Sequence, residues 1–145
     1  MSAIAIDQPA IGALTEVHFA IGMPGFPELH RFGCDRWGGE DSVFLLLSSV
    51  EQTHIQFVAT DPAVFFPHYR PDITSDTLAR VGATSAEEVV LLVILTLGER
   101  PADATANLLG PVVVNISTHE AVQAVLAGAS ELIRAPLMLG RRQPV

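Results

Sequence analysis

The chain has 145 residues, the length of a single domain, and its 16 acidic and 8 basic residues give a formal net charge of −8. All the basic residues are arginines, and only Arg134, Arg141 and Arg142 gather positive charge locally. Nucleic-acid binding depends on Lys and Arg neutralising phosphates, so this composition argues against direct binding to DNA or RNA. An acidic surface suits a basic protein partner better.

Apolar residues make up 49% of the chain, yet the longest apolar run, residues 89–95, is far shorter than the ~20 residues of a membrane-spanning helix. Residues 1–8 lack the basic segment and apolar core of a secretory signal. We therefore expect a cytoplasmic protein. Cys34 is the only cysteine, which excludes an internal disulfide and predicts a small buried side chain.

The N-terminal third contains one clear strand and one clear turn. Residues 1–15 show little periodicity and predict a loose or edge segment, whereas residues 16–21 alternate polar and apolar side chains as a half-buried strand does. In the turn that follows, Gly22 and Gly25 permit backbone angles closed to other residues, and Phe26 is expected to fill the core. A partner-facing role for Phe26 is the alternative.

Two further strands are predicted over residues 43–47 and 55–59, where apolar side chains run at strand length. The pair Gly38–Gly39, in the polar connection before them, suits a hairpin turn. We therefore expect neighbouring antiparallel strands in this part of the chain.

The segment that follows residue 59 predicts an anchored turn. Asp61 precedes Pro62, which disfavours helical angles for it and allows its carboxylate to bond downstream amides. Phe65 and Tyr69 lie four residues apart and can share one face, from which they would hold the turn against the body of the domain.

The next elements centre on a buried strand. Residues 85–88 form a capping-box pattern that predicts one helical turn, and the β-branched residues in 89–95 favour a central strand. Residues 98–103 predict a turn. Asn107 then sits at a corner where its amide can bond nearby backbone, just before a predicted strand over 112–116.

Four stretches in order carry a family resemblance. They are F-x-x-G-x-P-G-F at 19–26, the strand at 43–47 that ends in serine before an acidic turn, D-P-x-x-F-x-P-x-Y at 61–69, and T-A-N-L-x-x-P-x-V-x-N at 105–115. Together they resemble the flagellar assembly factor FliW family over nearly the whole chain. The chain departs from that pattern at Ser48, His68 and Glu131, where the family has glutamine, aspartate and an aromatic residue.

The resemblance implies a single domain over residues 1–145, with 1–15 and 140–145 loose. Its fold is expected to be mostly β, a compact, closed antiparallel barrel-like domain with one or two short helical turns, as the many short β-branched runs also indicate. The family binds flagellin in the cytoplasm and, when free, binds the translational repressor CsrA and relieves repression of flagellin synthesis. The candidate partner-binding residues are Phe26, Asp61, Phe65, His68, Tyr69 and Asn107.

Residues 119–129 support two readings. Ala121, Val122, Val125 and Leu126 recur at helical spacing and predict a helix over 119–127. The resemblance instead implies a hairpin end at 116–121 and a last strand that begins at Gln123. We prefer the strand.

The chemistry of catalysis is not evident. The five histidines show no metal-ligand spacing, so we expect no metal, no cofactor and no enzymatic activity, and we favour a monomer. One alternative is a small hydrolase-like enzyme that uses Asp61 and His68 as acid and base. Another is a structural subunit of the flagellum.

Overall fold

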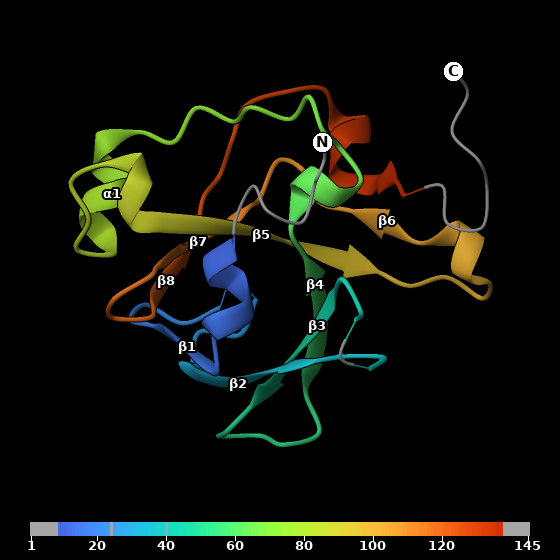
Figure 1. The fold of residues 1–145 in the computed structure, drawn as a ribbon, viewed down its shortest axis with the longest axis horizontal. Helices are drawn as coiled ribbons and strands as arrows, with labels where there is room; N and C mark the ends of the chain where they lie inside the picture. Colours follow the sequence, from blue (N-terminus) through green and yellow to red (C-terminus); the bar gives the residue numbers. More distant parts are fainter. Residues whose placement is uncertain (1–8, 24, 40, 138–145) are drawn as a thin grey trace.

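The computed structural model describes residues 9–23, 25–39 and 41–137, and within them nine strands form one sheet (Figure 1). Seven strands close into a barrel in the order β4-β3-β2-β1-β8-β7-β5, because β5 also pairs with β4. The barrel strands are β1 (Glu16–Phe19), β2 (Arg31–Arg36), β3 (Phe44–Ser49), β4 (Gln56–Thr60), β5 (Val89–Thr96), β7 (Val112–Asn115) and β8 (Glu120–Gln123). The predicted mostly β, closed fold is confirmed.

One neighbouring pair departs from the predicted antiparallel arrangement. β1 and β8 are parallel, with His18 opposite Glu120 and Phe19 opposite Ala121. A ring of seven strands cannot alternate direction all the way round, so at least one neighbouring pair has to be parallel. The parallel pair joins strands from the two ends of the sequence, where no short hairpin dictates direction.

The barrel interior is filled by alternate side chains of its strands. Phe19, Phe32, Leu47 and Leu92 are fully buried there. The turn Pro9–Ala13 and the residues after it add Ile11 and Leu14, 8% and 5% exposed, to the same core. The expectation of a loose segment over residues 1–15 is therefore wrong for this part, while residues 1–8 and 140–145 lie outside the described residues.

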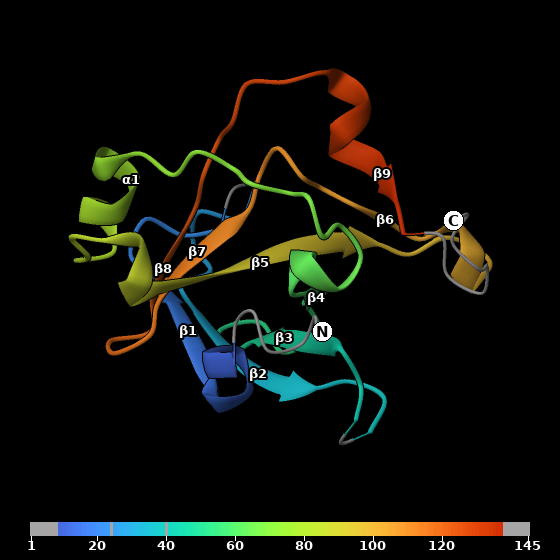
Figure 2. The same ribbon diagram turned by 45° about the horizontal axis from the view of Figure 1, so that its top comes forward.

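A short helix, α1 (Ser75–Arg80), covers the outer face of β7 and β8 and was not predicted (Figure 2). Thr74 caps it, since its hydroxyl accepts a hydrogen bond from the Thr77 N–H at 3.1 Å. Leu78 then packs with Val113 and Val122 in a second apolar layer outside the barrel. Across the described residues no helix is long and apolar enough to cross a membrane.

Residues 120–123 form a strand rather than part of a helix, as we preferred. The boundary was wrong, because Gln123 ends β8 instead of starting a strand. Ala121 points into the barrel and Val122 points toward α1, and both are buried. With both faces covered, consecutive apolar residues mimic helical spacing although the backbone is extended.

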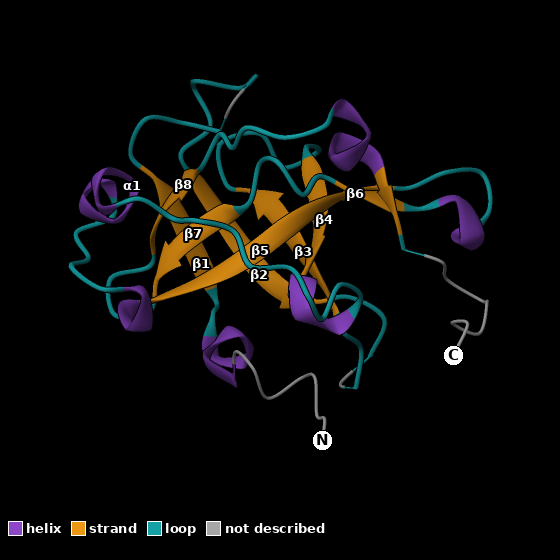
Figure 3. Ribbon diagram, turned by 90° about the horizontal axis from the view of Figure 1, so that it is seen from above, coloured by secondary structure: helices purple, strands orange, loops and turns teal. Residues whose placement is uncertain are grey.

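Two short strands, β6 (Thr105–Ala106) and β9 (Ala135–Pro136), extend the sheet from the end of β5, outside the barrel (Figures 2 and 3). A 3-10 turn, Ser130–Arg134, leads into β9. Further 3-10 turns lie at Pro62–Val64, Ala86–Glu88 and Pro101–Asp103.

The predicted local turns are confirmed. Gly38 and Gly39 have φ of 103° and 109° between β2 and β3, values that glycine adopts readily. The Ser85 N–H donates to the Glu88 carboxylate at 3.1 Å, the return half of the capping box. Hydrogen bonds from Thr84, and further ones from Ser85, lower the pKa of Glu88.

Candidate functional site

The turn after β4 contains three of the predicted residues, Asp61, Phe65 and Tyr69, and the last two pack against the same apolar cluster. The Asp61 carboxylate accepts a hydrogen bond from the Ala63 N–H at 2.9 Å and so starts the 3-10 turn, as the sequence predicts. Phe65 stacks on Phe44, with ring centroids 5.8 Å apart. Phe65 and Tyr69 both pack against the apolar cluster beside β5, β6 and β9. Asp61 and Phe65 therefore hold the turn that presents Tyr69.

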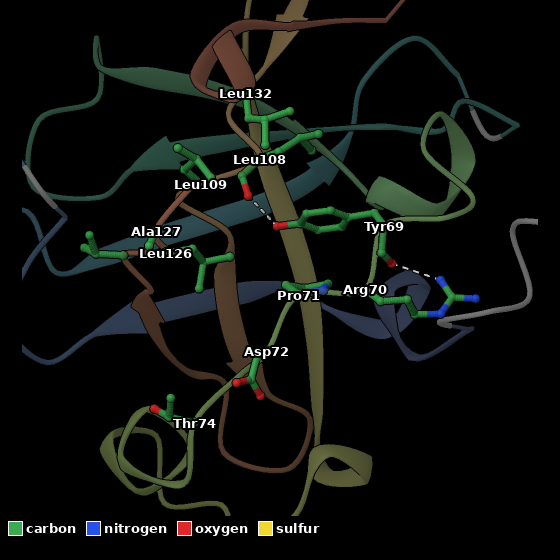
Figure 4. A pocket seen from close by; sticks show the side chains of 11 residues that line it. Tyr69, Arg70, Pro71, Asp72, Thr74, Leu108, Leu109, Leu126, Ala127 and Leu132 are labelled. Carbon is green, nitrogen blue, oxygen red and sulfur yellow. Dashed lines mark hydrogen bonds between the residues drawn. The ribbon is translucent and has the colours of Figure 1, made fainter. Parts of the chain in front are cut away.

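Tyr69 joins this turn to the corner before β7 (Figure 4). Its hydroxyl donates to the Leu108 carbonyl oxygen at 2.6 Å. Asn107 shapes the same corner, because its side-chain oxygen accepts from the Leu109 N–H at 3.0 Å. Burial raises the pKa of Tyr69 to about 12. Two of the four motif stretches thus meet at one hydrogen bond.

An apolar groove lies beside this bond. Its lining includes Tyr69, Leu108, Leu109, Leu126 and Leu132, which come from three separate segments of the chain (Figure 4). Leu132 is 38% exposed, and Val125, which also lines the groove, is 93% exposed. The groove is therefore a partly open apolar surface, and the hydrogen bond from Tyr69 to Leu108 joins two of the segments that line it.

The polar rim of the groove carries two charged side chains, Arg70 and Asp72, and neither forms an ion pair with a described residue. The Arg70 guanidinium donates to the carbonyl oxygens of Pro67 and Tyr69, at 3.1 and 2.9 Å. Asp72 is exposed and forms no hydrogen bond or ion pair with any described residue. A cationic group on a bound molecule would find an unpaired carboxylate there.

The remaining predicted residues are not part of the groove. Phe26 packs edge-on against Phe57, with ring centroids 5.7 Å apart, and is partly buried against the core of the barrel. His68 is exposed and forms no hydrogen bond or ion pair with a described residue. The acid–base pair considered for Asp61 and His68 is therefore not formed.

Sequence reasoning missed the other wall of the groove, Val125, Leu126 and Leu132. The signal was present, since Val125 and Leu126 are apolar and adjacent. Their spacing, however, predicts that both side chains lie on the buried face of a helix or strand. Only the course of the chain after β8 shows that Val125 faces solvent.

No other cluster among the described residues offers a clearer site. His18 lies between the carboxylates of Glu16 and Glu120, at 2.9 and 3.8 Å, and its hydrogen bond lowers the pKa of Glu16. In the part of the chain that the structure describes, no group of three or more His, Cys, Asp or Glu residues is placed to hold a metal ion. Cys34 is buried, as predicted, and burial raises the pKa of its thiol to about 11.

The structure also shows where two departures from the family pattern, Ser48 and Glu131, lie. The Ser48 hydroxyl accepts a hydrogen bond from the Gln56 amide at 3.2 Å on the barrel surface. Glu131 is exposed, one residue before Leu132. Neither side chain lines the groove.

Sequence comparison relates this chain to flagellar assembly factors of the FliW family. The model of the FliW protein family matches residues 1–137. The flagellar assembly factor FliW of Symbiobacterium thermophilum is 40% identical over 122 residues, which cover 84% of this chain and 88% of that protein. The FliW of Bacillus subtilis is 34% identical over 119 residues, 82% of each chain.

The fold is shared with a solved structure. A crystal structure of the flagellar assembly factor FliW matches with a TM-score of 0.78 and 30% sequence identity, and the match covers 88% of this chain and 89% of that chain. The sequence match and the fold match both span most of the molecule. The chain belongs to the FliW family of flagellar assembly factors.

Proposed function

We propose that this protein binds flagellin in the cytoplasm and that, when free of flagellin, it binds a CsrA-type repressor and relieves repression of flagellin synthesis. Membership of the family supports a role in flagellar assembly. The observation that carries flagellin binding is the apolar groove beside Tyr69, with Leu109, Leu126 and Leu132 along it.

The groove is suited to an apolar segment of a large partner. Burying one exposed Leu or Val side chain contributes about 1.5–3 kcal/mol, so several such contacts can offset the cost of association. The hydrogen bond from Tyr69 to Leu108 fixes the two walls before the partner arrives. Less ordering is then required on binding.

The charge of the chain supports the second partner. A repressor that binds RNA presents basic surface, and this protein carries a net charge of −8. Opposite charges steer the encounter and raise the association rate, an effect screened beyond about 8 Å at physiological salt. Flagellin binding in an apolar groove should depend on salt much less.

The first test is a pull-down from native cytosol at low salt, followed by surface plasmon resonance across a salt series. We expect flagellin and a small RNA-binding repressor to be enriched. Salt should slow association of the repressor and leave its dissociation rate less changed. A repressor association rate indifferent to salt would contradict the steering argument.

A matched pair of variants tests the groove itself. Leu132 lines it, whereas the neighbouring Ile133 is 47% exposed and does not. Leu132→Ala should weaken flagellin binding about tenfold, and Ile133→Ala should leave it within about twofold. Equal effects would place flagellin elsewhere.

The two partners should not be held productively together. Adding flagellin to the complex with the repressor should restore repression in a translation assay. A stable ternary complex that leaves repression in force would argue against the proposed switch.

A further inference from the structure

The chain after β8 stays extended and keeps pairing on one side. The Ala124 N–H donates to the Pro111 carbonyl oxygen and the Leu126 N–H to that of Leu109, both at 2.8 Å. In an antiparallel ladder, alternate residues direct their backbone groups to opposite edges. The backbone groups of Gln123 and Val125 therefore point away from β7.

The edge of β8 that faces away from β7 is not paired with β1 beyond Ala121. β1 pairs with β8 only at Glu120 and Ala121, and then the chain of β1 turns away, with the Gly22 N–H bonded to the Phe19 carbonyl oxygen at 3.0 Å. The Val125 N–H donates to no described residue. The barrel is closed around its middle but has an open edge where β8 continues past β1.

The open edge is not protected as exposed edges usually are. Residues 121–130 contain no charged residue and no proline, the groups that commonly block pairing with another chain. Val125 is 93% exposed, and Ile21, which follows the neighbouring strand β1 in the same direction, is 66% exposed. An unpaired amide beside exposed apolar side chains recognises an extended apolar peptide.

The carboxylate of Asp72 lies beside the edge and indicates what kind of peptide can bind there. Asp72 lines the same groove as Val125, Leu126 and Ala127 and has no partner among the described residues. A strand added to this edge would direct alternate side chains to the face on which Leu126 lies. A basic side chain among them would neutralise Asp72. A second copy of this chain fits less well, because two molecules with a charge of −8 repel each other.

We propose that the edge formed by residues 123–127 takes up an extended segment of flagellin as an additional β-strand, with apolar residues at alternate positions and a basic residue directed at Asp72. This inference rests on the proposed function. It adds the binding mode and the sequence character of the segment that is bound.

The decisive variant is Val125→Pro, which removes the outward N–H without breaking a described hydrogen bond. Its control is Val125→Ala, which keeps the N–H and shortens the side chain. By calorimetry with purified flagellin, we expect Val125→Pro to lose at least about tenfold in affinity and Val125→Ala about fourfold. Both variants should keep the circular dichroism spectrum of the parent protein.

A second measurement needs no variant at Val125. Hydrogen exchange of the Gln123 and Val125 amides in the unaltered protein should be fast alone and slow with flagellin. Asp72→Asn should reduce the salt dependence of flagellin binding. If Val125→Pro does not fold, the exchange measurement decides.

The outcomes separate the two proposals. If flagellin binds but both Val125 variants bind alike and the amides exchange unchanged, the edge is not used and the proposed function stands. If flagellin does not bind the unaltered protein, both fail. If sedimentation shows a dimer that Val125→Pro abolishes, the occupant is a second copy and the inference is overturned.

Discussion

Phe26 and Tyr69 are both aromatic residues of the family motifs, yet they lie in regions of opposite character. Phe26 packs against the barrel core, edge-on to Phe57. Tyr69 lines the groove and uses its hydroxyl to hold the corner at Leu108. The Phe26 ring packs against a closed core, and the Tyr69 ring lines an open surface.

The comparison shows that a motif aromatic does not by itself mark a binding site. Phe26 follows a turn whose glycines bring the chain back over the barrel, so its ring is used for packing. Tyr69 combines an apolar ring with a polar tip that finds a partner at the edge of the fold. Substitutions near Phe26 should therefore lower the free energy of unfolding strongly. Substitutions near Tyr69 should lower it only modestly.

The largest effect is expected at the turn before Phe26. Gly22 has φ of 81°, and a Cβ there would overlap the Pro27 carbonyl oxygen. Gly22→Ala should lower the free energy of unfolding by more than about 3 kcal/mol, measured by urea denaturation. Gly25 has φ of 87° with nothing within 4 Å of the position a Cβ would take, so Gly25→Ala should cost only about 1 kcal/mol. Equal losses would show that crowding at Pro27 is unimportant.

Phe26→Ala should be the next most damaging change. It removes the edge-on contact with Phe57 and leaves space against the core, at a cost of about 3 kcal/mol in the same denaturation experiment. Flagellin affinity of the folded fraction should be unchanged. A selective loss of affinity with unchanged stability would revive Phe26 as a partner contact.

Tyr69→Phe should cost less, about 1 kcal/mol, because it deletes a single hydrogen bond and leaves the ring in place. The Leu108 carbonyl oxygen loses this donor, and the groove wall should become less ordered. Thermal denaturation measures the stability change. A neutral result would mean that water replaces the hydroxyl at Leu108.

The smallest effect concerns alkaline pH. The pKa of Tyr69 is raised from 10.0 to about 12, so the folded state holds the phenolic proton more tightly than the unfolded state does. Its stabilising contribution is complete below pH 10 and is lost as the pH rises toward 12. The difference in stability between the parent protein and Tyr69→Phe should therefore shrink over this range. Cys34, with a pKa of about 11, titrates over the same pH range in both proteins, so its contribution to stability cancels in the difference.

Much of the molecule follows from local sequence. Alternation in 16–21, the apolar run at 89–95 and the glycine pair at 38–39 each specify their element, because strand period and turn angles depend on adjacent residues. Asp61 and Asn107 bond backbone groups within two residues, so their roles could be predicted too.

Tertiary structure alone decided the rest. Residues 120–123 became a strand because β7 and β1 pair with them and because the core and α1 cover both faces, which removes the alternation that identifies a strand. The parallel pair arises only when seven strands close a ring. The groove forms because Tyr69, Leu132 and Val125, from separate segments, line one surface. Proximity between distant segments produces no periodic pattern in the sequence, so it could not be predicted.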